Sequence, residues 1–172
     1  MKKLIMTLLG VLMTLPMFSR DFEFLYKGQR LTYTILDEEA CTCQTKAGWE
    51  DSTSVNAGHS VGGDVTIPST VKFEGKDYTV VAIGAYSFYY CDLITSVTLS
   101  SSVKEIGSCA FSRCSGLTSF IIPDGVSMIK SGTFSQCTGL TSVSIPDSVT
   151  EIGAYAFSTC TGLTSITIPP FV

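Results

Sequence analysis

Hydrophobic residues recur with a fixed period in the second half of the chain. Residues 117–139 are followed by a close copy at 140–162, so the period is 23 residues, and a further copy begins at Leu163. In each copy, apolar residues occupy positions one, four and six, and a proline usually follows. Side chains four and six share one face of a strand, because side chains alternate along a strand, and proline ends it. Since one copy cannot bury its apolar side alone, the period predicts a stack of coils with a shared core.

Rows of equivalent residues define the predicted core of this stack. Position one is always a large aliphatic residue, and a phenylalanine and then a cysteine recur in the other half of each coil. These rows are Ile94, Leu117, Leu140 and Leu163; Phe88, Phe111, Phe134 and Phe157; and Cys91, Cys114, Cys137 and Cys160. We interpret the cysteines as small apolar residues that fill space beside the rings. A metal site or a run of disulfides is the alternative.

Residues 20–63 lack the period and are predicted to form an N-terminal cap of short strands. Leu31, Tyr33 and Ile35 alternate with threonines, which is typical of a half-buried strand. A cap is expected because the first coil of a solenoid exposes its apolar core unless other residues cover it. The repeats are predicted to fill residues 64–172 and to be truncated at the C-terminal end, because the last copy stops after one strand.

The first coil contains an insertion of about nine residues, 72–80, whose pattern predicts a β-hairpin. Phe73 and Tyr78 flank its turn, and Tyr86, Tyr89 and Tyr90 follow soon after. We interpret this aromatic group as packing against the hairpin. The alternative is a binding surface, because tyrosine combines a large apolar ring with a polar tip.

Residues 1–19 are predicted to be a secretory signal peptide. Lys2 and Lys3 precede about fifteen mostly apolar residues, fewer than the roughly 20 that span a bilayer. Pro16 would also break a spanning helix. We predict cleavage after Ser19, with an uncleaved anchor as the alternative. The mature chain is expected to have no membrane span and to be secreted or exposed on the cell surface, with the periplasm crossed in transit.

The charge balance excludes some classes of partner and activity. The chain has 11 Lys and Arg against 15 Asp and Glu, a net charge of −4. This balance argues against nucleic acid, which is bound through clusters of basic side chains. His59, the only histidine, stands in a Gly- and Ser-rich stretch and is expected to be solvated. We therefore expect no catalytic residues, no cofactor and no metal, and we predict that the chain is not an enzyme.

The repeated pattern LTSVxIPxxVxxIGxxAFxxCxG resembles the BspA-like leucine-rich repeats of bacterial surface and secreted proteins, which are common in Bacteroidetes. The resemblance covers residues 64–172. It implies a β-rich α/β solenoid, a right-handed leucine-rich-repeat coil. Parallel strands are expected on the concave face, turns and short helical pieces on the other side, and a β cap at the N-terminal end.

The resemblance also implies a binding or adhesion module without catalysis. Its expected partner is an extracellular protein or glycan, such as host matrix or another bacterial surface. The alternative is a structural spacer, or a fragment whose open solenoid end docks onto another chain or onto a second copy.

The expected contact surface is the concave face, whose outward positions two, three and five carry hydroxyl groups and one isoleucine. These residues are Thr95, Ser96, Thr98, Thr118, Ser119, Ile121, Thr141, Ser142, Ser144, Thr164, Ser165 and Thr167. The alternative is that threonine and serine stand there only because they suit solvated strands.

Overall fold

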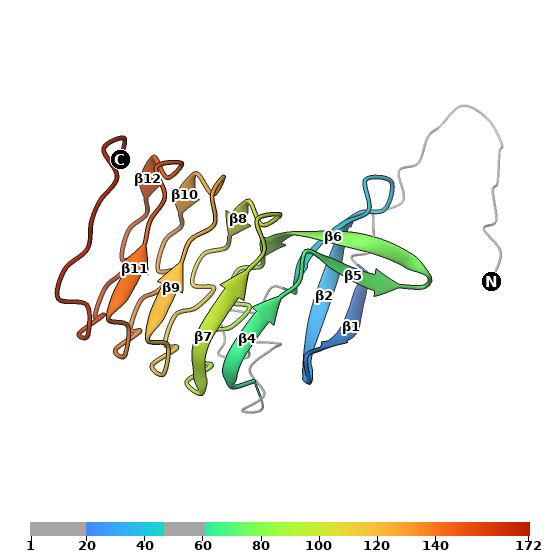
Figure 1. Ribbon diagram of the computed structural model, residues 1–172, viewed down its shortest axis with the longest axis horizontal. Helices are drawn as coiled ribbons and strands as arrows, with labels where there is room; N and C mark the ends of the chain where they lie inside the picture. Colours follow the sequence, from blue (N-terminus) through green and yellow to red (C-terminus); the bar gives the residue numbers. More distant parts are fainter. Residues whose placement is uncertain (1–19, 47–60) are drawn as a thin grey trace, which may run out of the picture.

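A computed structural model describes residues 20–46 and 61–172 of the chain (Figure 1). Strands, bends and turns make up these two ranges, and no helix is found in them. Accordingly, they contain no helix that is long and apolar enough to cross a bilayer. The predicted signal peptide and His59 lie outside the described residues.

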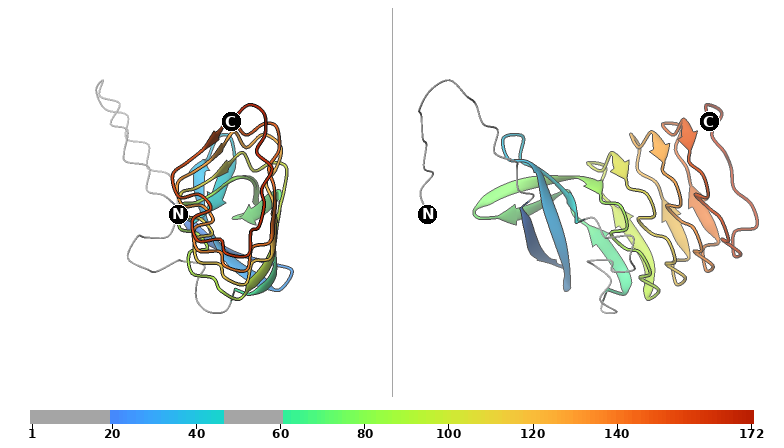
Figure 2. Two further views of the ribbon diagram at one scale, coloured as in Figure 1. Left: turned by 90° about the vertical axis from the view of Figure 1, so that its left-hand side faces the viewer. Right: turned by 180° about the vertical axis from the view of Figure 1, so that it is seen from behind.

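Four parallel strands form the sheet that carries the predicted contact residues. They are β4 (Gly63–Ile67), β7 (Ile94–Leu99), β9 (Ser119–Ile121) and β11 (Ser142–Ser144), in the spatial order β11-β9-β7-β4. Val97 pairs with Phe120, and Phe120 with Val143, so residues one period apart are direct neighbours. This register confirms that each period forms one coil. Figure 2 shows the coils side by side along one axis.

A second set of contacts joins the coils on the side away from this sheet. It includes the two-residue strands β8 (Glu105–Ile106), β10 (Met128–Ile129) and β12 (Glu151–Ile152), of which β10 and β12 pair in parallel. In the following turns, the N–H groups of Phe88, Phe111 and Phe134 donate to carbonyl oxygens one coil further on, at 2.8, 3.0 and 2.8 Å.

The prediction of short helical pieces on this side is wrong. A helix would direct these N–H groups to carbonyls of their own coil, four residues earlier. Instead, residues with positive φ interrupt each turn, for example Tyr86 (φ 55°) and Tyr90 (φ 63°). The N–H groups then point to the next coil, which makes the fold β-rich without a helical layer in the described residues.

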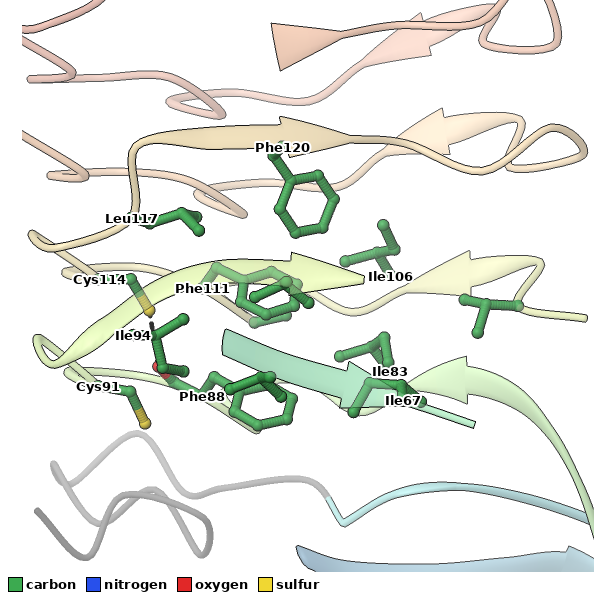
Figure 3. Packing of buried hydrophobic residues seen from close by; sticks show 14 of the residues in the cluster. Ile67, Ile83, Phe88, Cys91, Ile94, Ile106, Phe111, Cys114, Leu117 and Phe120 are labelled. Carbon is green, nitrogen blue, oxygen red and sulfur yellow. Dashed lines mark hydrogen bonds between the residues drawn. The ribbon is translucent and has the colours of Figure 1, made fainter. Parts of the chain in front are cut away.

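The core is a column of parallel phenylalanine rings (Figure 3). The centroids of Phe88 and Phe111 lie 5.3 Å apart, those of Phe111 and Phe134 5.8 Å, and those of Phe134 and Phe157 5.5 Å. Phe120 of β9 packs against two of these rings at a steep angle, 5.0 Å from Phe111 and 4.7 Å from Phe134. The rows predicted from the sequence are therefore confirmed as stacked columns.

Burial decreases along the stack toward its last coil. In the row of position one, Ile94, Leu117 and Leu140 are fully buried, whereas Leu163 is half-buried. The strand expected at residues 163–168 is not formed, and Ile168 is 47% exposed. Each inner coil is covered by the one that follows it, whereas residues 163–168 are more exposed than their equivalents.

The N-terminal sheet joins the first coil through one long strand. The sheet contains β1 (Asp21–Tyr26), β2 (Gln29–Asp37), β3 (Thr42–Thr45), β6 (Lys76–Ile83) and β5 (Thr70–Phe73), in that order. The predicted hairpin is confirmed as β5 and β6, which pair antiparallel. Strand β6 also pairs in parallel with β3 and, at Ala82 and Ile83, with β8 of the next coil. It therefore links the N-terminal sheet directly to the stack.

A buried polar contact supplements this link. The Thr45 hydroxyl oxygen accepts hydrogen bonds from the Gly84 N–H at 3.1 Å and from the Ser87 hydroxyl at 2.7 Å, and both Thr45 and Ser87 are fully buried. Leu31 and Tyr33, from the predicted alternating strand, are buried on the same sheet. The contact fixes the end of β3 to the first turn of the repeats.

Replacing the central ring of the column tests its role. We expect Phe134→Ala to lower the free energy of unfolding by about 3–5 kcal/mol, because a large cavity would open beside Phe111 and Phe157. Chemical denaturation followed by circular dichroism measures the change. Tyr155→Ala is the control, since this ring is 77% exposed. Equal stabilities of the two variants would contradict the placement of Phe134 in the core.

Candidate functional site

The predicted contact residues lie on the outer side of the four-stranded sheet. Of the twelve, eleven are exposed and Ser96 is half-buried. The structure brings those of β7, β9 and β11 together, since Ser96 pairs with Ser119, Ser119 with Ser142, and Ile121 with Ser144. Thr164, Ser165 and Thr167 are exposed too, but their segment is not part of the sheet. We call the outward residues of β4, β7, β9 and β11 the sheet face.

The threonines at position two have a structural role. Both the N–H and the hydroxyl of Thr118 donate to the Thr95 carbonyl oxygen, each at 3.2 Å. Thr141 does the same to the Thr118 carbonyl oxygen, at 2.8 and 2.9 Å. These hydroxyls strengthen the entry of each strand, so their donors are already used within the stack. The repeated threonine was visible in the sequence, whereas its bonding partner was not.

One end of the sheet face carries a charge that the sequence analysis missed. Asp64 of β4 pairs in register with Ser96, so it occupies position three of the first coil. Its carboxylate accepts hydrogen bonds from the Ser96 hydroxyl at 2.6 Å and the Thr95 hydroxyl at 3.2 Å. These two bonds lower the pKa of the Asp64 carboxyl group. The sheet face therefore extends beyond the twelve predicted residues and carries a charge at this end.

The centre of the sheet face is an exposed isoleucine among hydroxyl groups. Ile121 is 71% exposed, although it belongs to a strand whose Phe120 is buried. Ser119, Ser142 and Ser144 surround it in the register of β9 and β11. Within the described part of the chain, no hydrogen bond engages these three hydroxyl groups. They remain available to a partner.

The repeated cysteines act as hydrogen-bond donors in the core. The thiols of Cys114, Cys137 and Cys160 donate to the carbonyl oxygens of Phe88, Phe111 and Phe134 in the preceding coil, at 3.1, 3.0 and 3.0 Å (Figure 3). All seven cysteines are free thiols. The described ranges contain no group of three His, Cys, Asp or Glu that could hold a metal. The four cysteines of the row are buried beside the rings, as the space-filling interpretation expects, and three of their thiols are also donors.

The aromatic group of the first coil divides into two clusters. Phe73 of the hairpin packs on Phe22 of β1, with centroids 4.5 Å apart. Tyr89 and Tyr90 instead contact each other, at 6.4 Å, and the Arg113 guanidinium of the next coil lies over both rings, at 5.7 and 5.9 Å. The interpretation as packing against the hairpin is wrong for this second cluster, which faces the neighbouring coil.

A polar hollow of about 370 Å³ lies beside this second cluster, where each coil turns toward its strand. Tyr90, Arg113, Gln136 and Thr159 line it as equivalent residues of successive coils. Asp92, Ser115 and Thr138, two residues further on, form a second lining row. We call this hollow the corner groove. Its residues are of different types in each coil, so the repeat pattern gave no sign of it.

The parallel strands of 23-residue coils and the row of leucines define a leucine-rich repeat protein. A family model described as the BspA type leucine rich repeat region matches residues 65–172 in six copies. The chain belongs to this family.

Two solved structures are similar to the chain. A leucine-rich repeat protein from Bacteroides ovatus is 35% identical over 83% of the chain, with a TM-score of 0.69. The chain spans 34% of the length of that protein. A leucine-rich repeat protein from T. pallidum is 24% identical, with a TM-score of 0.63, over 81% of this chain and 69% of that one. The latter likeness shows the fold alone. No curated protein matches the chain.

Thiol reactivity tests the positions of the cysteines. Five thiols are buried, and only Cys41 and Cys109 are partly exposed. Since the thiolate is the reactive form, and burial raises the pKa of the Cys137 thiol to about 12, we expect two fast and five slow thiols. Titration with a chromogenic disulfide reagent at about pH 8, before and after unfolding, measures both classes. Cys109→Ser should remove one fast thiol. Seven equal rates would contradict the buried row.

The same raised pKa values predict weaker folding in alkali. The pKa of the Cys137 thiol rises from 9.0 to about 12 on folding, because burial disfavours the thiolate. The unfolded chain therefore loses this proton first as the pH rises, which favours unfolding. We expect the free energy of unfolding to fall between pH 9.0 and about 12, measured by denaturant titration. In the Cys137→Ala variant, the free energy of unfolding should fall less steeply with pH. Equal slopes in the variant and the parent would contradict the burial of the Cys137 thiol.

Proposed function

We propose that this chain is the binding region of a secreted or cell-surface protein and that its sheet face contacts an extracellular protein. The single observation that carries the proposal is the exposed Ile121 at the centre of a face with free hydroxyl groups. Membership of the BspA-type family supports the surface location and a role in binding. Because the chain spans 34% of the Bacteroides ovatus protein, the activity of any larger protein is part of this proposal.

The chemistry of the sheet face favours a protein partner. Centres of protein interfaces are poor in charged residues and rich in apolar side chains, with polar groups around them. Ile121 supplies the apolar centre, Ser119 and Ser144 belong to the polar surround, and the charge of Asp64 lies at the end of the sheet. The threonine bonds between coils hold the strands in place, so little conformational freedom is lost on binding.

The proposal includes the finer features of the fold. We take the stack as the right-handed solenoid expected from the sequence, with the N-terminal sheet as its cap. Support comes from β6, which joins that sheet to the first coil, and from the Thr45 contact with Gly84 and Ser87. Residues 1–19 act as the secretion signal in this proposal, and adhesion is the biological role.

A second candidate is docking through the last coil onto another chain or a second copy. Ile168, Phe171 and Val172 are 47%, 69% and 49% exposed, which gives this end an apolar surface. Sedimentation over a range of concentrations distinguishes the two roles. Self-association that Phe171→Lys abolishes favours docking, whereas a monomer at all concentrations contradicts docking onto a second copy.

Replacing the apolar side chain of Ile121 by a charged one tests the role of the sheet face. The chain is titrated against a panel of purified extracellular-matrix proteins by biolayer interferometry. For a panel protein that binds saturably, we expect Ile121→Lys to weaken the affinity about tenfold or more, because the substitution places a charge in the apolar centre.

Leu25→Lys is the matched control, since Leu25 is 59% exposed but lies on β1, outside the sheet face. It should bind as the parent does. Equal affinities of the parent and Ile121→Lys would refute the role of this face, and so would the absence of saturable binding across the panel.

A further inference from the structure

We propose that the corner groove is a binding site for a neutral oligosaccharide. The groove is distinct from the sheet face, so the inference does not rest on the protein partner proposed above. It is built by four successive coils at the place where each chain segment turns toward its strand. Tyr90, Arg113 and Asp92 supply the ring and the two charges on which the assignment depends.

The coil corners beneath the groove are closely packed and leave little room for change. A Cβ atom on Gly116 would lie 2.4 Å from the Asp92 carbonyl oxygen, and one on Gly139 would lie 2.3 Å from the Ser115 carbonyl oxygen. Glycine is therefore required at both corners. The close contacts hold Gly116 against the backbone of Asp92 and Gly139 against the backbone of Ser115. These two residues of the second lining row are thus packed through their backbone.

The polar side chains of the groove are not used within the protein. In the described residues, no hydrogen bond or ion pair engages the side chains of Asp92, Ser115, Gln136 or Thr138. The Arg113 guanidinium lies over Tyr89 and Tyr90, at 5.7 and 5.9 Å, and forms no ion pair with Asp92. By contrast, the threonines at position two are bonded to the next coil. The groove therefore presents a carboxylate, a guanidinium, an amide and hydroxyls to a ligand.

This set of groups fits a sugar better than other small ligands. The Tyr90 side chain is 49% exposed, so part of its ring can pack against the C–H face of a pyranose. Sugar hydroxyls both donate and accept, which suits a carboxylate beside a guanidinium and an amide. One positive and one negative side chain balance, so a neutral ligand needs no counter-charge. The volume of about 370 Å³ is within the range of small-molecule sites, but the polar lining disfavours an apolar ligand.

The residues of the first lining row share one backbone conformation. Tyr90, Arg113, Gln136 and Thr159 all have positive φ, at 63°, 64°, 61° and 58°. Glycine adopts this conformation at no steric cost, whereas other residues are strained in it. None of the four coils has glycine in this row. The row of Tyr86, Cys109 and Tyr155, which does not line the groove, has the same conformation at 55°, 53° and 59°, so the strain belongs to every coil and does not by itself mark the site.

The test compares two tyrosines in the same backbone conformation. Tyr90→Asn removes the ring from the groove with a residue that tolerates positive φ. Tyr155→Asn is the matched control, because Tyr155 has φ 59° and is 77% exposed but does not line the groove. Each protein is titrated by calorimetry with neutral hexose oligosaccharides of different linkage, and with a sialylated and a uronic acid oligosaccharide.

We expect saturable binding of at least one neutral oligosaccharide, weakened about tenfold by Tyr90→Asn and changed less than about twofold by Tyr155→Asn. Circular dichroism checks that both variants are folded. Three results would overturn the proposal: no neutral oligosaccharide binds, only the acidic sugars bind, or the two variants lose affinity equally. Ile121→Lys should leave sugar binding unchanged, and Tyr90→Asn should leave the binding of a matrix protein unchanged, so the two proposals can fail separately.

Discussion

Each coil of this protein depends on its neighbours to remove its phenylalanine ring from water. Phe111 and Phe134 are completely buried because parallel rings cover them from both sides. No ring could be buried within one coil, since a coil is only one strand and one set of turns thick. The hydrophobic driving force therefore acts between coils, along the axis of the stack. The rest of the structure follows from keeping these rings in register.

Hydrogen bonds connect the coils in both directions. At the entry of the strands, Thr118 and Thr141 donate to the preceding coil, and Cys114 and Cys137 do the same beside the rings. In the turns, the backbone N–H groups donate to the following coil instead. An inner coil is thus both donor and acceptor toward each neighbour. This arrangement satisfies the backbone without helices and leaves the sheet face and the corner groove free for partners.

The sequence predicted the features that repeat and missed those that do not. The leucine, phenylalanine and cysteine rows could be found because chemistry and spacing recur together, and the single hairpin could be found from its local turn pattern. The contact of Thr45 with Gly84 and Ser87 joins distant segments, so no local pattern marks it. The charge of Asp64 on the sheet face depends on the register of β4.

The corner groove could not be predicted from the sequence for a different reason. Its first lining row contains Tyr90, Arg113, Gln136 and Thr159, which share a backbone conformation but no side-chain chemistry. A search for recurring residue types passes over such a row. The expected helical pieces failed at the same positions, because positive φ values cannot be recognised when glycine is absent. Conformation rather than composition is what repeats in this part of each coil.

The register of the rings also limits how genes for such proteins can change in length. Loss or duplication of one whole unit, from Leu117 to the residue before Leu140, would bring another ring, thiol and threonine to the same places. An insertion inside the strand or inside the turn that carries the ring would set polar groups over the column, whereas the inserted residues 72–80 are accommodated in the β5–β6 hairpin. Recombination between units therefore yields folded products in discrete steps, and each new unit brings fresh residue types to the outer surface while the interior stays constant.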